Sequence, residues 1–154
     1  MAEYLYPTRT NSGDEWLKDM LDSWRGTGCR YLCFPWIKFR VHTIRDQSFW
    51  LYMYYSQNRS DIPDLMGVIE YRLSIMEWGT SKYLGREIHV ARGDEPGTIW
   101  FLADRYEKIR KAEGDLVGLD DFRHADGKRL GSSIRNSIPP VALQSEIFVT
   151  ERYP

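Results

Sequence analysis

Residues 49–76 contain two apolar segments that are separated by a polar loop. The first, Phe49–Tyr55, is an almost unbroken run of apolar and aromatic residues, and it is too short for a typical helix. In the second, Leu65–Met76, polar and apolar residues alternate from Val68 onward, as in a strand that has one face on the core. The two segments therefore predict a β-hairpin, which would form the spine of a β-rich domain.

Shorter patterns on either side of the hairpin predict the remaining elements. The segment 104–110 fits helical spacing as well as strand spacing, so its type stays open at this stage. Leu119–His124 is typical of a single helical turn. The other patterns predict an extended arm at Met1–Ser12, a helix at Asp14–Trp24 that Gly26 and Gly28 end, and strands at Arg30–Phe34, Ile37–Thr43, Arg86–Val90, Thr98–Ala103 and Ser132–Ser137.

These elements favour a mainly β fold with a few short helices, in the α+β class. Strands and helices do not alternate regularly, which argues against a doubly wound sheet. A small β-barrel would remove exposed strand edges and is the expected architecture. At 154 residues the chain is expected to form a single domain, 1–154, in which residues 1–45 are an N-terminal arm and helix.

Charge and cysteine content narrow the classes of function. The formal net charge of −1 gives no global attraction to nucleic acid or to a membrane, so a polyanion site would have to be a local patch. Cys29 and Cys33 have no second pair that would complete a zinc site, so neither a metal nor a cofactor is expected. The chain has no signal-peptide pattern at Met1–Asn11 and no apolar run long enough to span a bilayer, which predicts a reduced, cytoplasmic protein with no membrane partner.

Three stretches of the chain resemble the EVE domain of the PUA-like superfamily, which is related to ASCH and YTH domains. The first is the strand, Pro-containing loop and Gly-led strand of residues 50–70. The second is Pro96-Gly97-Thr98-Ile99-Trp100 with its basic continuation to Lys108, and the third is the closing pattern of Leu130, Arg135, Ser137 and Val141. The resemblance implies a PUA-like small β-barrel, from whose pattern residues 1–45 depart. It also implies a non-catalytic module that binds DNA or RNA and reads a modified or flipped base in an aromatic pocket.

Aromatic residues make up 14% of the chain and supply the candidates for such a pocket. A base stacked on a Trp or Tyr ring gains on the order of 1–3 kcal/mol, although large rings are also the usual fillers of a core. Alternation places Trp50, Tyr52 and Tyr54 on one strand face, which we expect to be the more open one. The base-binding candidates are Trp36, Trp50, Tyr52, Tyr54, Trp78, Trp100, Arg135 and Ser137, and the candidates for phosphate contacts are Arg45, Lys128 and Arg129.

Two other classes of function remain open. A small metal-dependent enzyme acting on nucleic acid could use Asp126 and Lys128 with the acidic residues between positions 115 and 121. An interaction domain could use the aromatic run Phe49–Tyr55 to form a homodimer. His42, His89 and His124 are isolated, without metal-ligand spacing among them, and are expected to be structural or exposed.

Overall fold

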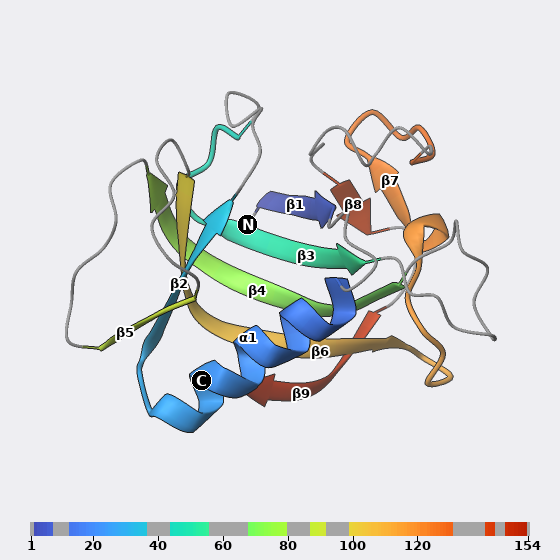
Figure 1. Ribbon diagram of the computed structural model, residues 1–154. Helices are drawn as coiled ribbons and strands as arrows, with labels where there is room; N and C mark the ends of the chain where they lie inside the picture. Colours follow the sequence, from blue (N-terminus) through green and yellow to red (C-terminus); the bar gives the residue numbers. More distant parts are fainter. Residues whose placement is uncertain are drawn as a thin grey trace.

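The computed structural model describes residues 2–7, 13–36, 44–55, 68–79, 87–91, 99–130, 141–143 and 147–153, and statements about the fold refer to these residues. They form mostly strands around a single long helix (Figure 1). The elements are β1 (Ala2–Pro7), α1 (Gly13–Thr27), β2 (Tyr31–Trp36), β3 (Phe49–Tyr55), β4 (Val68–Gly79), β5 (Ile88–Val90), β6 (Ile99–Lys111), the 3₁₀ turn η2 (Leu119–Asp121), β7 (Phe122–His124), β8 (Val141–Leu143) and β9 (Ile147–Tyr153).

The strands form one mixed sheet of seven strands and a separate pair. The order in the sheet is β1-β3-β4-β6-β2-β5, with β9 paired to β6, and β7 pairs with β8 outside it. The pairs β1–β3 and β2–β5 are parallel, and the other pairs of the sheet are antiparallel. Among the described strands the path ends at β1 and β5, which do not pair with each other. The α+β class is therefore confirmed, but the described sheet is open and does not show the expected barrel.

The predicted hairpin is confirmed and lies in the centre of the sheet. Strand β3 pairs with β4 in antiparallel register, from Phe49 opposite Ile75 to Tyr55 opposite Val68, with a bulge after Met53. Because β1 and β6 flank this pair on either side, both strands have neighbours along their two edges. Side chains of β3 also pack into a core cluster on each face, Leu51 and Met53 in one and Tyr52 and Tyr54 in the other, and this burial explains why its sequence is apolar on both faces rather than alternating.

Helix α1 covers one face of the sheet, as Figure 1 shows. Its buried side chains recur at helical spacing and pack into a core cluster with Leu51 and Leu73 of the central strands. The helix ends at Thr27, and Gly28 follows with φ of 71°, a conformation that suits glycine at a helix C-terminus. The predicted helix is confirmed, with Leu17, Met20, Leu21 and Trp24 as its described buried side chains, but it continues past Trp24 through Gly26, so Gly26 does not end it as expected. The side chain of Trp16 lies outside the described residues.

The opposite face of the sheet is covered by the segment that follows β6. Phe122 of β7 is buried there, and its ring meets that of Tyr52 edge-on, with ring centroids 4.9 Å apart. The backbone N–H of Ile69 donates to the carbonyl of Val117 at 2.9 Å, which fixes this segment to β4. A second core cluster, of Leu5, Tyr52, Tyr54, Ile69, Ile109, Val117 and Phe122, fills the space between them. The sheet thus has apolar packing on both faces.

Three points about the elements are revised, settled or refined. Met1–Ser12 is not simply an extended arm, because Ala2–Pro7 pairs in parallel with β3 and buries Tyr4, Leu5 and Tyr6. The segment 104–110 is strand, since β6 runs to Lys111 with neighbours on both edges. Residues 119–121 do form a helical turn, of the 3₁₀ type, and a strand follows it at once. The strands expected at Ile37–Thr43 and Ser132–Ser137 lie outside the described residues.

Candidate nucleic-acid interface

Strand β6 changes its partner halfway along one edge. Strand β4 follows it on the other edge, while β2 pairs with Ile99–Ala103 and β9 pairs with residues 106–111. Asp104 and Arg105 lie between these two partners. The register with β4 also slips here, and it leaves Asp104 of β6 and Met76 of β4 as extra, bulged residues. Bulges re-aim side chains and are common beside functional sites, which makes this junction a candidate site.

Two arginines lie against the ring of Trp50 on the sheet face opposite α1. The guanidinium carbon of Arg72 is 3.9 Å from the ring centroid, and that of Arg105 is 5.1 Å away. Both distances are within the range of cation–π attraction. The register explains the arrangement, because Trp50, Ser74 and Arg105 face one another across β3, β4 and β6. Trp50 is half-buried and Arg105 is exposed, so part of this group is open to solvent.

A buried carboxylate holds Arg72 in place. Arg72 Nε donates to Glu107 Oε1 at 2.7 Å, and its Nη1 donates to the hydroxyl of Tyr52 at 3.3 Å. Arg152 adds a second ion pair to Glu107 Oε2 at 3.2 Å. Glu107 is only 3% exposed, so these two arginines compensate a carboxylate that is buried away from water. The guanidinium beside Trp50 is therefore fixed, whereas that of Arg105 is not held in this way.

The pKa values of Tyr52 and Arg72 are both raised, which favours the neutral tyrosine and the charged arginine. Burial, and then the carboxylate of Glu3, raise the pKa of Tyr52 above its ordinary value, and its hydroxyl donates to Glu3 Oε1 at 2.9 Å. Burial alone would lower the pKa of Arg72, but the contacts with Tyr52 and Glu107 outweigh it and raise that pKa. Arg72 therefore stays cationic beside the indole at every physiological pH.

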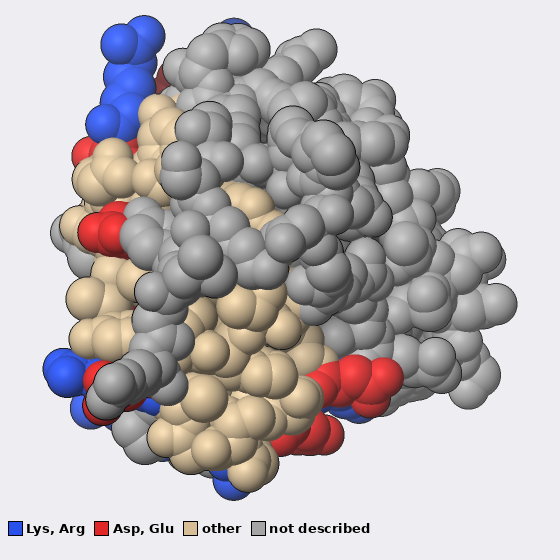
Figure 2. All heavy atoms as spheres, turned by 60° about the vertical axis from the view of Figure 1, so that its left-hand side comes forward, with Lys and Arg blue, Asp and Glu red and all other residues tan. Residues whose placement is uncertain are grey.

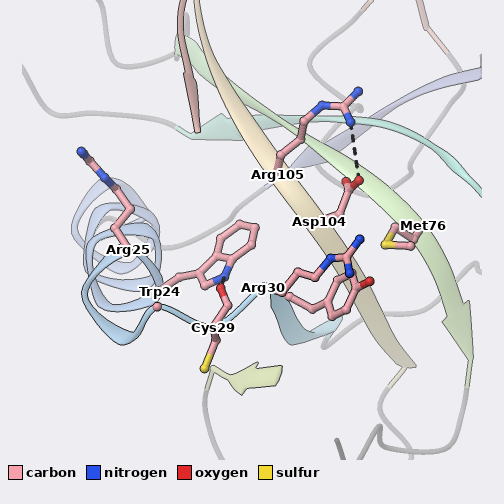
Figure 3. A pocket seen from close by; sticks show the side chains of 9 residues that line it. Trp24, Arg25, Cys29, Arg30, Met76, Asp104 and Arg105 are labelled. Atoms are coloured by element: carbon pink, nitrogen blue, oxygen red, sulfur yellow. Dashed lines mark hydrogen bonds and ion pairs between the residues drawn. The ribbon is translucent and has the colours of Figure 1, made fainter. Parts of the chain in front are cut away.

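A cavity of about 590 Å³ lies on the other side of the β6 junction, next to the end of α1. It exists because the chain turns at Gly28 and enters β2 beside the bulges of β4 and β6. Figure 3 shows Trp24 on the helix side of this hollow and Arg30, Asp104 and Met76 on the strand side. Its lining includes Trp24, Arg30, Tyr31, Met76, Asp104 and Arg105. Arg105 thus lines the cavity and also contacts the Trp50 ring.

Trp24 in the cavity lining is held by a hydrogen bond and a ring contact, and one oxygen of the Asp104 carboxylate has no hydrogen-bond partner. The indole N–H of Trp24 donates to the carbonyl of Cys29 at 3.0 Å, and its ring lies 5.7 Å from that of Tyr106. Burial raises the pKa of Tyr106 to about 12, although Arg25 acts against this shift. Within the described part of the chain, Asp104 Oδ1 is buried without a hydrogen-bond partner. Native structures contain few such atoms.

The aromatic residues predicted to bind a base fall into different environments. Tyr52 and Tyr54 are buried in the second core cluster, so the prediction that this strand face is open is wrong for both of them. Trp100 is 3% exposed and packs with Cys33 and Leu102. Of the predicted set, Trp50 and Trp78 are half-buried. The run Phe49–Tyr54 is buried apart from Trp50, so it offers little exposed aromatic surface, and the homodimer alternative stays a prediction.

The polar candidates do not gather around Trp50 in the described residues. Arg45, Lys128 and Arg129 are exposed. Trp78 donates its indole N–H to the carbonyl of Asp46 at 2.9 Å, so this ring is tied to the segment before β3. The side chain of Trp36 and the whole of residues Arg135 and Ser137 lie outside the described residues.

The enzyme alternative gains no support from the placement of Asp126. Its Oδ1 accepts the backbone N–H of Lys128 at 3.0 Å, which is a turn contact, and Gly127 between them has φ of 87°. Among the described residues, no group of three or more His, Cys, Asp or Glu is arranged to hold a metal ion. Cys29 and Cys33 are not joined in a disulfide, and His89 Nε2 lies 3.1 Å from the hydroxyl of Ser23.

Sequence reasoning did not single out Arg72, Asp104, Arg30 or Trp24 as site residues. Arg72 occupies a polar position of the alternating β4 pattern, opposite Tyr52, and this position was a usable signal once the register of β3 and β4 was known. The roles of Asp104 and Arg30 depend on a bulge and on the turn after α1, which have no local sequence signature of a site.

None of the described helices is long and apolar enough to cross a membrane.

Comparisons with known proteins add no further assignment. No family model, no curated protein and no solved structure matches the chain. The likeness to EVE domains therefore stays a prediction from the sequence motifs.

Proposed function

We propose that the protein is a non-catalytic nucleic-acid-binding module that stacks a base on Trp50. The observation that carries this proposal is the half-buried indole with the guanidinium groups of Arg72 and Arg105 at 3.9 and 5.1 Å. Base–aromatic stacking contributes about 1–3 kcal/mol per base, and arginine planes add cation–π attraction and phosphate contacts. Trp50, Arg72 and Arg105 together could supply the stacking surface, the cation–π attraction and the phosphate contact.

The two arginines have different tasks in this proposal. Arg72 is held by Glu107 and Tyr52, so it orients the indole and loses little freedom on binding. The side chain of Arg105 is 44% exposed, and its ion pair with Asp104 is long, at 3.5 Å, so it can turn toward a phosphate. Arg152, with a side chain that is 76% exposed, lies beyond Glu107 and extends the positive edge of the group.

Binding of this kind has to be local rather than a property of the whole surface. The chain has a formal net charge of −1. Figure 2 shows the face on the β5 side of the sheet, where uncharged residues fill most of the described surface and charged ones lie at its margins. A module of this kind would bind through a few stacked bases, and its affinity would fall only modestly with salt because few phosphates are contacted.

The finer part of the proposal is that the module is a PUA-like, EVE-like reader of a modified or flipped base. It is supported by the order of the sequence motifs from residue 50 onward and by the density of aromatic residues. A base that leaves its stack exposes a face that an indole can cover, and its edge can then be read by polar groups.

The test is a binding titration with Trp50→Ala and Arg105→Gln. Fluorescence anisotropy with short labelled DNA and RNA oligonucleotides, plain and modified, would be measured at two salt concentrations. Trp50→Ala should weaken binding about 30-fold, which corresponds to about 2 kcal/mol, the middle of the range for one lost stack. Trp50→Phe should recover part of the loss, because a smaller ring still stacks. Lys18→Gln, which removes an exposed charge on α1, serves as the control and should bind like the wild type.

Circular dichroism would show that each variant is folded. Unchanged binding in both Trp50→Ala and Arg105→Gln would refute the assignment of the interface. Absence of binding to every oligonucleotide would refute the proposed function. Binding that distinguishes modified from plain bases would support the reader assignment, whereas binding that is blind to them would leave a stacking module without it.

A further inference from the structure

We propose that the cavity between the end of α1 and strands β2, β4 and β6 binds a guanine nucleotide, either free or within a strand. The cavity volume of 590 Å³ lies within the range of about 300–1,000 Å³ that is usual for small-molecule sites. This inference goes beyond the proposed function, because it concerns another site and names a base.

The walls of the cavity suit a flat ring that carries a negative group. Met76 is 40% exposed, the largest exposure of a large hydrophobic side chain in the described residues, and Tyr31 is half-buried beside it. Arg30 is exposed, and its guanidinium carbon lies 5.1 Å from the centroid of the Tyr31 ring. Apolar surface, an aromatic face and a stacked guanidinium are the features by which proteins hold a base and its phosphate.

The carboxylate of Asp104 selects among the bases. An ionised carboxylate only accepts hydrogen bonds, and here Oδ1 has no partner while Oδ2 has a single contact, to Arg105 Nη1 at 3.5 Å. Its side chain is 29% exposed, but Oδ1 is buried, so the carboxylate has to turn about the Cα–Cβ bond to present both oxygens to a ligand in the cavity; Oδ1 has no hydrogen bond that would oppose this turn. A ligand that brings two adjacent N–H donors would satisfy it fully.

Guanine is the common base with that pattern. Its Watson–Crick edge presents the N1–H and the 2-amino group side by side, which match the two oxygens of a carboxylate, and its O6 can accept from an arginine. On the corresponding edges, adenine and cytosine place a ring acceptor next to their amino group, and uracil presents one N–H between two carbonyls. Each of these would set a lone pair against the carboxylate. Arg30 is then available for the phosphate, with Arg105 near O6.

The proposal is tested by calorimetric titration of the whole chain with guanosine 5′-monophosphate and with the adenosine, cytidine and uridine monophosphates. The wild type should prefer the guanine nucleotide by about 10-fold or more, as expected for two hydrogen bonds that the other bases cannot make. Asp104→Asn should abolish that preference. It should instead favour xanthosine 5′-monophosphate, in which a carbonyl replaces the 2-amino group and accepts from the new amide.

Two further variants separate this specificity from a structural effect. Asp19→Asn makes the same chemical change at an exposed position of α1 and should leave the preference intact. Arg30→Gln should weaken binding of the monophosphate more than that of guanosine, because only the former loses a phosphate contact. This second test stays informative even if Asp104→Asn does not fold.

The outcomes keep the two proposals apart. Equal affinity for all four nucleotides, no binding, or a guanine preference that survives Asp104→Asn would overturn the cavity assignment. In those cases, a loss of oligonucleotide binding in Trp50→Ala would still support the proposed stacking function. If guanosine monophosphate binds and oligonucleotides do not, the cavity takes a free nucleotide and the stacking function fails. If a guanine-containing strand competes with the monophosphate in the wild type and not in Asp104→Asn, the cavity also accepts the base within a strand.

Discussion

Replacing Glu107 by Gln removes the charge that holds Arg72 and keeps almost the same shape. Glu107 is 3% exposed, and the side chain of Arg72 is 17% exposed, so the change leaves a largely buried guanidinium without its counter-charge. One-sided removal of a buried ion pair costs about 3–5 kcal/mol. Because Arg72 is not fully buried and its pair with Tyr52 remains, we expect about 3 kcal/mol, at the lower end of that range.

The measurement is urea unfolding at neutral pH, followed by tryptophan fluorescence. The midpoint should fall without a change in slope, and the melting temperature should fall by about 6–12 °C. Glu113→Gln, an exposed position in the turn after β6, should stay within about 0.5 kcal/mol of the wild type.

A double variant shows whether the cost comes from the uncompensated charge. Glu107→Gln combined with Arg72→Met removes both charges, and it should be more stable than Glu107→Gln alone, since no buried charge is left unpaired. A Glu107→Gln variant as stable as the wild type would refute the reasoning. So would a double variant that loses the sum of the two single costs.

The remaining predictions concern the helix end, the core and the tyrosines. Gly28→Ala should cost about 1 kcal/mol of stability, because φ is +71° and the added methyl group meets no atom, so only backbone strain remains. Gly26→Ala, inside the helix and equally open, should instead stabilise the protein by about 0.5–1 kcal/mol. Thermal melts that shift in the same direction for both variants would contradict this prediction. Leu17→Ala, at a fully buried position of α1, should cost about 2–5 kcal/mol in urea unfolding, and a loss below 1 kcal/mol would mean that α1 is not packed as described. Tyr106 has an ordinary pKa of 10.0 that burial raises to about 12, so its contribution is complete below pH 10 and is lost as the pH rises toward 12, by up to about 1.4 kcal/mol per pH unit. Tyr106→Phe should therefore show a smaller loss of stability between pH 9 and 11 than the wild type, and an equal loss in both would contradict the assignment.

The central hairpin and the helix could be predicted because their signals are local. Phe49–Tyr55 is too apolar and too rich in aromatic residues to be anything but a buried strand, and α1 repeats its buried side chains at helical spacing. Strand β1 could not be predicted in this way. Its place depends on parallel pairing with β3, more than 40 residues away in the chain, and only that pairing makes Tyr4, Leu5 and Tyr6 core residues.

The site was harder to predict than the fold for a physical reason. Alternation correctly placed Trp50 and Tyr52 on the same face, but it could not tell that the segment around Phe122 returns to cover Tyr52 and leaves Trp50 half-open. The neighbours of Trp50 come from β4 and β6, and they are set by the register of those strands, including two bulges. Local sequence carries little information about register.

The shared edge of β6 also bears on how the chain reaches its folded state. Residues 106–111 of β6 pair with β9 (Ile147–Tyr153), so this edge is completed only after synthesis has passed β9 and β9 has left the ribosome. Until then the second half of β6 presents unpaired backbone groups, which can recruit strands of other chains. Truncations that remove β9 should consequently aggregate during synthesis rather than accumulate as a smaller folded domain.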